Sequence, residues 1–135
     1  MNLAEQQIEL KVQKNIRLAE DDLVLWIQAA LDNRQSYGDL QETQFRNLVR
    51  VADTTDSPEV IKNFLRYQVG RDKKWGRGDN SLAAKIVNDI DTQIKQKANV
   101  IHKEISGSDF KSIWLELIRR YLGYGARYLK YINSK

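Results

Sequence analysis

The chain of 135 residues has no cysteine and only one histidine, one methionine and one proline. Without cysteine there is no disulfide and no thiolate metal site, a composition that fits a reducing compartment. No apolar run approaches the roughly 20 residues that span a bilayer, and the N-terminus lacks the basic-then-apolar pattern of a secretory signal. We therefore expect a cytoplasmic protein that has no contact with a membrane.

Side chains that support catalysis are equally scarce. The single histidine, His102, has no cysteine or paired acid near it, so we expect a surface or boundary residue. Asp89 and Asp91 lie two residues apart and would point to different faces of a helix. The acidic run at residues 20–22 lacks the ligand spacing of a calcium loop. A phosphate loop needs a lysine followed by serine or threonine after its glycines, and Gly70, Gly76 and Gly78 are not followed by such a pair. We expect no enzyme activity, no metal site and no cofactor.

Alternation of apolar and polar residues, the mark of a half-buried strand, is nowhere sustained along the chain. Apolar residues instead recur at spacings of three and four. These patterns predict helices at about residues 3–33, 43–52, 58–69, 82–105 and 110–132. The predicted fold class is all-α, a single compact bundle of about five helices that forms one domain over residues 1–135.

Capping residues set the expected helix boundaries. Ser57 is placed to cap the third helix, with Pro58 at its first position. Gly70 is expected to end that helix in the left-handed conformation. Gly107 is expected to stop the fourth helix.

The apolar pattern also predicts which side chains are buried. In the first helix, Leu18, Trp26 and Leu31 widen the buried stripe. That width fits either an ordinary amphipathic helix or one that also contacts a neighbouring protein. In the third helix, we expect Val60 and Tyr67 to be buried.

Charge is distributed unevenly along the chain. Residues 1–60 carry a net charge of −5 and residues 61–135 a net charge of +9. This asymmetry indicates two faces for different partners, although unevenly placed solvated charges would give the same pattern.

The densest positive segment, residues 62–77, holds six cations against the single acid Asp72. It leaves the third helix and crosses a glycine-rich loop with one tryptophan in its middle. Cations interleaved with an aromatic ring suit the phosphates and bases of nucleic acid. We expect contact with RNA or DNA through Lys62, Arg66, Arg71, Lys73, Lys74, Trp75 and Arg77. Trp75 has an alternative interpretation, as a plug folded back onto the bundle.

A second basic row lies on the last helix, where arginine and tyrosine recur at spacings of four, three and four residues. Both side chains can stack on bases while the arginines meet phosphates. Alternatively, the tyrosines pack at the edge of the bundle. Gly123 and Gly125, which each cost roughly 1 kcal/mol relative to alanine in a helix, fit a close approach of another chain or a kink. The row comprises Arg120, Tyr124, Arg127 and Tyr131, with Lys130 beside it.

The order of three segments resembles a known family. A short helix led by Thr43, a helix ending in Tyr67-Gln68-Val69-Gly70-Arg71 and an aromatic last helix follow one another. This order is similar to the small α-helical subunit of type III CRISPR–Cas effector complexes, in its Csm-type form. The resemblance spans roughly residues 43–131. The chain departs from the family in the glycines of the last helix and in its long acidic first helix.

The resemblance implies a non-catalytic subunit in antiviral defence, present in stacked copies beside the other subunits of a ribonucleoprotein complex. The implied partners are the guide RNA, the target RNA or both, the other subunits and further copies of the chain. Two other classes remain open. One is a stand-alone helical DNA-binding regulator, which would need a tight helix-turn-helix, and the other is an adaptor whose basic patch binds an acidic protein. If the resemblance holds, the positions to test for RNA contact, chosen for their local charge and spacing, are Arg66, Arg71, Lys73, Lys74, Arg77, Arg120 and Arg127.

Overall fold

The computed structural model describes residues 2–135, and that part of the chain is helical without any strand. Two short turns, the 3-10 turn η1 (Arg34–Ser36) and the π-helical turn η2 (Ile90–Ile94), accompany the helices. Because α5, η2 and α6 follow one another without a break, the described residues form six separate helices rather than about five. The predicted all-α fold is confirmed. The helices are α1 (Leu3–Leu18), α2 (Glu20–Asp32), α3 (Glu42–Thr54), α4 (Pro58–Arg71), α5 (Leu82–Asp89), α6 (Lys95–Glu104) and α7 (Phe110–Asn133).

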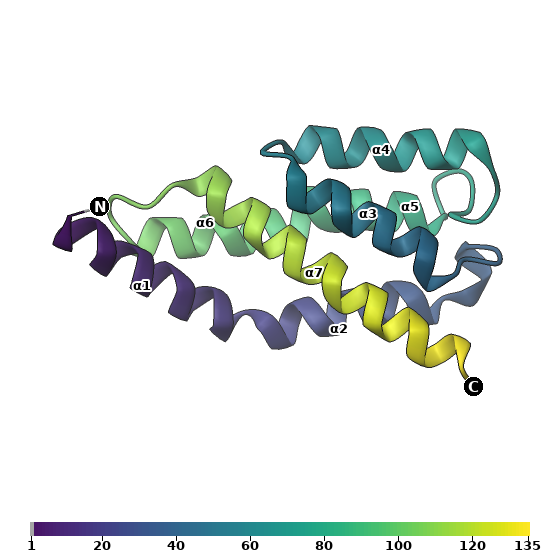
Figure 1. Ribbon diagram of the computed structural model, residues 1–135, viewed down its shortest axis with the longest axis horizontal. Helices are drawn as coiled ribbons and strands as arrows, with labels where there is room; N and C mark the ends of the chain where they lie inside the picture. Colours follow the sequence, from purple (N-terminus) through teal and green to yellow (C-terminus); the bar gives the residue numbers. More distant parts are fainter. Residues whose placement is uncertain (1) are drawn as a thin grey trace.

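The last helix, α7, is the central element of the bundle. It crosses the molecule diagonally in Figure 1 and packs against α2, α3 and α6. α4 packs against both α3 and α5, and α1 extends along the opposite edge toward the N-terminus. None of the helices within residues 2–135 has the length and apolarity needed to cross a membrane. The buried residues of α7 are Ile113, Leu115, Leu117, Ile118, Tyr121, Leu122, Gly125, Ala126 and Leu129.

The predicted helix over residues 3–33 is in fact two helices. The chain turns at Ala19, which closes α1 and opens α2. Three acids at residues 20–22 occupy the first turn of α2, where the partial positive charge of a helix N-terminus favours them. Leu31 is buried and Trp26 half-buried, as expected. Leu18 is exposed, so its predicted place in the buried stripe is wrong.

The start of α4 is as predicted and its end is not. The Ser57 side chain accepts a hydrogen bond from the N–H of Val60, and Pro58 is the first helical residue. The helix continues through Gly70 to Arg71, and Gly70 does not have a positive φ angle. The expected left-handed stop at Gly70 is therefore wrong.

α4 packs on the bundle through a narrower face than its apolar residues indicate. Ile61 and Leu65, four residues apart, are fully buried. Val60 and Tyr67, which were predicted to be buried, are exposed. On a helix, a residue one or two positions away from the buried row points in a different direction.

The π turn η2 keeps one long apolar row buried. Buried residues recur every four positions from Leu82 to Ala98. In a regular α-helix each step of four rotates the row by about 40°, so its later members would turn away from the core. The wider π turn takes up this rotation. The indole N–H of Trp114 on α7 donates to the carbonyl of Ile90 at 2.9 Å, which supports the turn.

Candidate nucleic-acid interface

The loop after α4, residues 72–81, is held firmly against the bundle. The Trp75 side chain is only 1% exposed, and its ring stacks on Phe45 with 5.5 Å between centroids. The Trp75 carbonyl accepts a hydrogen bond from the N–H of Ala83 at 3.2 Å. Trp75 is therefore the plug of the alternative interpretation, and its expected role as an exposed stacking surface for bases is wrong.

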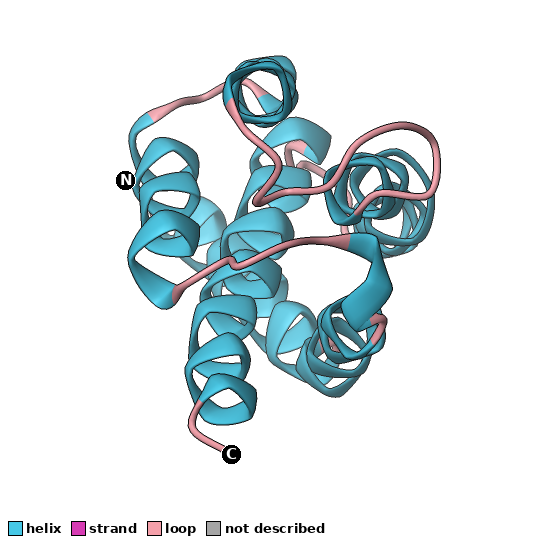
Figure 2. Ribbon diagram, turned by 90° about the vertical axis from the view of Figure 1, so that its right-hand side faces the viewer, coloured by secondary structure: helices cyan, strands magenta, loops and turns pink. Residues whose placement is uncertain are grey.

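A second loop, residues 33–41, lies beside the first at the end of the molecule that Figure 2 faces. The N–H of Gly38 donates to the Lys74 carbonyl at 3.1 Å. Gly76 has a φ of 81°, and a Cβ there would lie 2.1 Å from the Ser36 carbonyl oxygen, so only glycine permits this approach. The Asp72 carboxylate accepts from the N–H of Lys74 at 2.8 Å. The one acid of the segment thus shapes the loop.

On this fixed frame the cations of the segment remain available to solvent. Arg66, Arg71, Lys73 and Arg77 are exposed, and Lys74 is half-buried. Within residues 2–135, none of the five forms an ion pair. We call these five residues the α4 basic surface. Because no carboxylate neutralises them, their charge is free to attract an anion.

Lys62 does not belong to this surface. Its side chain is buried, and its Nζ lies 2.6 Å from a Glu59 carboxylate oxygen and 2.9 Å from one of Asp91. Burial lowers the pKa of Lys62, but hydrogen bonds to the two carboxylates outweigh it and leave the pKa raised. Lys62 links α4 to η2, and its expected contact with nucleic acid is wrong.

The basic row of the last helix, which we call the α7 row, is partly neutralised from within. Arg120 lies 3.5 Å from carboxylate oxygens of both Glu20 and Glu116. Glu20 also accepts a hydrogen bond from the Tyr124 hydroxyl. Two further cations of the row are exposed and have no ion pair within residues 2–135, namely Arg127 and Lys130.

Tyr121, Tyr124 and Tyr128 of α7 donate hydrogen bonds to acids on other helices, whereas Tyr131 is exposed and donates to none within residues 2–135. Tyr128 donates to Asp32 at 2.5 Å, and this bond, with some burial, raises the pKa of Tyr128 to about 12. Burial and the hydrogen bond to Glu20 likewise raise the pKa of Tyr124. Tyr124 and Tyr128 thus follow the alternative interpretation, in which tyrosines pack at the edge of the bundle.

The glycines of α7 and α4 have different surroundings. A Cβ at Gly125 would lie 2.7 Å from Phe45 and 2.8 Å from Ile27, so this glycine lets α7 close against α2 and α3. A Cβ at Gly123 or at Gly70 would meet nothing within 4 Å. Each of these two helical glycines lowers the stability of its helix by roughly 1 kcal/mol relative to alanine. Packing within the chain does not require a glycine at either position.

Sequence reasoning missed a buried polar cluster around Asp89. This carboxylate is fully buried and accepts hydrogen bonds from Tyr121 at 2.6 Å and Gln93 at 2.9 Å, while Lys85 Nζ lies 2.9 Å away. Burial and the neighbouring Asp89 raise the pKa of Tyr121 well above its ordinary value. The signal was available, because Asp89 stands three residues after buried Ile86, at the edge of the apolar row.

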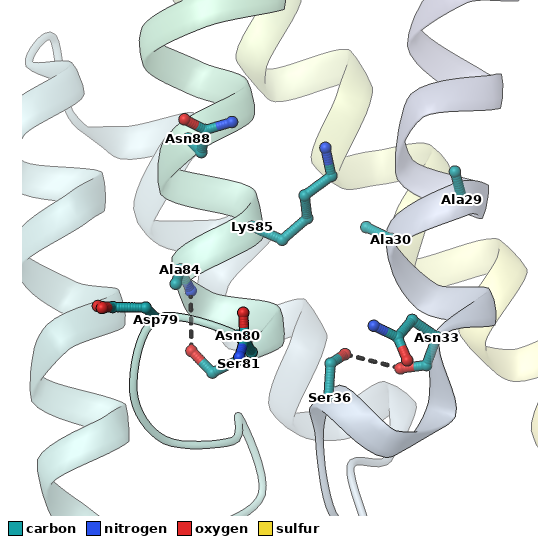
Figure 3. A pocket seen from close by; sticks show the side chains of 10 residues that line it. All are labelled: Ala29, Ala30, Asn33, Ser36, Asp79, Asn80, Ser81, Ala84, Lys85 and Asn88. Carbon is teal, nitrogen blue, oxygen red and sulfur yellow. Dashed lines mark hydrogen bonds between the residues drawn. The ribbon is translucent and has the colours of Figure 1, made fainter.

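Lys85 also lines a polar hollow of about 370 Å³ between α2 and α5, which Figure 3 shows from close by. The Lys85 side chain extends from α5 into this hollow, toward which Asn33, Asn80 and Asn88 contribute amide groups. Its ammonium group is already paired with Asp89. Within residues 2–135, no group of three or more histidine, cysteine or acidic side chains is placed to hold a metal ion.

A second residue that sequence reasoning misplaced is Tyr67. Its side chain is 61% exposed on α4, between Arg66 and Arg71. Its position two residues after buried Leu65 was the available signal, since such residues point to different sides of a helix.

No family model, no curated protein and no solved structure matches this chain. The functional interpretation therefore depends on the residues and their geometry. The likeness to type III CRISPR small subunits stays an expectation drawn from three segments of the sequence.

Proposed function

We propose that this chain is a non-catalytic, cytoplasmic subunit of an RNA-guided ribonucleoprotein complex of the type III CRISPR kind, in which it binds RNA. The α4 basic surface is the observation that supports this function most. Its five cations have no ion pair within residues 2–135, while the loop that carries three of them is pinned by Trp75 and Gly76. A cluster of unpaired charge on a fixed frame suits an extended anion.

The physics of such a surface fits a strand of any sequence. Cations that meet phosphates release counterions, so binding depends steeply on salt and little on base sequence. A frame that is already ordered loses less conformational freedom when it binds. In an RNA-guided complex, base pairing supplies the specificity and the protein holds the backbone.

An apolar row on α1 and α2 supports contact with other subunits. Within α1 its leucines are exposed and spaced seven and eight residues apart, which places one every two turns on about the same side of that helix. Leu25 is exposed on α2, beyond the turn at Ala19. The row lies on α1 and α2, away from the α4 basic surface. Copies that join this row to a different surface of the next copy make a head-to-tail contact that can continue without closing. The row comprises Leu3, Leu10, Leu18 and Leu25.

The RNA contact is tested by replacing Lys73, Lys74 and Arg77 together with alanine. We expect weaker binding of a labelled single-stranded RNA and a salt dependence whose slope falls by about 0.7 for each lost phosphate contact. Fluorescence anisotropy across a series of salt concentrations measures both. The matched control replaces Lys11, Lys14 and Arg17 on α1, which removes the same charge from exposed positions.

If both triple variants bind as the parent does, the proposed RNA contact is wrong. Tighter binding of duplex DNA would favour the regulator, and binding only to an acidic protein would favour the adaptor. Membership of a complex is tested by a pull-down from the native host. Recovery of other proteins together with a small RNA is expected, and recovery of the chain alone would contradict the proposal.

A further inference from the structure

We propose that Tyr67 and Gly70 of α4 form a stacking site for an unpaired nucleobase of the RNA strand that the α4 basic surface holds. This inference depends on the proposed function and adds the residue that contacts the base. The occupant is one nucleobase of a single strand, since a flat aromatic ring beside unpaired cations recognises a base joined to a phosphate.

The ring of Tyr67 is free to stack. It is 61% exposed, and within residues 2–135 it contacts no other aromatic ring and its hydroxyl makes no hydrogen bond. Arg66 precedes it, and Arg71 lies one turn later on the same side of the helix. Both arginines are exposed and unpaired. An exposed, unused ring thus lies between two cations that have no partner in the chain.

Gly70 lies one turn after Tyr67 and leaves room beside the ring. It has helical backbone angles, and a Cβ there would meet nothing within 4 Å. Neither a left-handed turn nor close packing therefore explains a glycine at this helical position. A ligand that approaches the helix backbone next to Tyr67 does explain it.

Other aromatic residues near the cations are already engaged. Trp75 is buried against Phe45. The exposed Tyr131 of α7 has the Lys135 ammonium 4.5 Å from its ring centre and Tyr128 at 6.1 Å. Tyr67 is thus the aromatic residue of α4 that remains open beside the α4 basic surface.

The first test compares two RNA strands of equal length and charge, an oligouridine of about ten nucleotides and its abasic counterpart. The parent protein is expected to bind the oligouridine about tenfold more tightly, a typical gain for one stacked base. Tyr67→Ala should remove this preference without changing the salt slope, whereas Tyr67→Phe should keep it. Val100→Ala, which truncates an exposed side chain on α6 outside both basic regions, is the control and should bind both strands as the parent does.

The second test uses the open glycines. Gly70→Ala should raise the melting temperature by about 3–4 °C, because alanine favours the helix, and at the same time weaken binding of the oligouridine. Gly123→Ala should raise the melting temperature similarly and leave binding unchanged. Weaker binding by Gly123→Ala and unchanged binding by Gly70→Ala would place the base on α7 and overturn the proposal.

The outcomes separate this inference from the proposed function. If the parent binds RNA with the expected salt slope but Tyr67→Ala keeps the preference for bases, the stacking site alone is wrong. If neither strand binds, the proposed function fails first. If Tyr67→Ala changes the sedimentation of the RNA-free protein but not its RNA binding, Tyr67 lies in an interface between copies, and the stacking site is overturned.

Discussion

The α4 basic surface and the α7 row have similar compositions, but acids neutralise part of the α7 row and none of the α4 basic surface. On α7, Arg120 is paired with two glutamates, and three of the helix's tyrosines donate to acids on α2 and α5. On α4 and its loop, Asp72 is engaged with the backbone, and within residues 2–135 no acid forms an ion pair with the five cations. The number of cations in a segment therefore does not determine whether they are free to bind an anion. That depends on whether acids from other parts of the fold lie next to them.

The largest expected effect concerns the anchor of the α4 basic surface. Trp75→Ala removes a fully packed indole and should lower the free energy of unfolding by about 3–5 kcal/mol. Urea denaturation followed by circular dichroism measures this loss. Trp75→Phe, which keeps a ring against Phe45, is the control and should lose less than half as much. A loss below about 1 kcal/mol for Trp75→Ala would mean that the loop is held by other contacts.

The next effect distinguishes the glycines of the two regions. Gly125→Ala places a methyl group against Phe45 and Ile27, and overpacking of this kind should cost about 1–3 kcal/mol. The same substitution at Gly70 should instead stabilise the protein. Melting temperatures of the two variants check the opposite signs. Equal shifts would show that α7 can move away from α3 without cost.

The smallest expected effect tests whether the acids beside the α7 row keep its cations from contacting RNA. Glu20→Gln removes one charge partner of Arg120, and a partly exposed pair of this kind contributes less than about 1 kcal/mol to stability. The salt slope of RNA binding should steepen by about 0.7, because Arg120 can then meet a phosphate. The pKa of Tyr124 should also fall toward its ordinary value, which ultraviolet titration detects. An unchanged salt slope would mean that the RNA does not reach α7.

Much of the fold follows from the sequence because helical periodicity and caps are local. The Ser57–Pro58 start of α4 and the stop at Gly107, which has a φ of 86°, needed no tertiary information. The break at Ala19 was missed because the apolar spacing continues across it. The acids that begin α2 were the available cue for a new N-terminus.

The site was harder to predict because availability depends on contacts between distant segments. Lys62 is removed from the surface by Asp91, and Trp75 by Phe45; neither partner is a sequence neighbour. The exposure of Tyr67 could have been predicted, because it lies two residues after the buried Leu65 and therefore points to a different side of the helix. Whether the five cations of the α4 basic surface bind RNA is a matter for the experiments above.

The π turn at residues 90–94 has a consequence for the chain lengths that this fold can accept. A π turn spans one residue more than the α turn that it replaces, since its hydrogen bonds reach five residues rather than four. Losing one residue there would restore a regular helix and leave the buried faces of α5 and α6 pointing in nearly the same directions. The same loss within α7 would rotate the part of α7 beyond it by about 100° and turn the buried residues of that part away from the core. Related chains that differ by a single residue are therefore expected to differ at this turn.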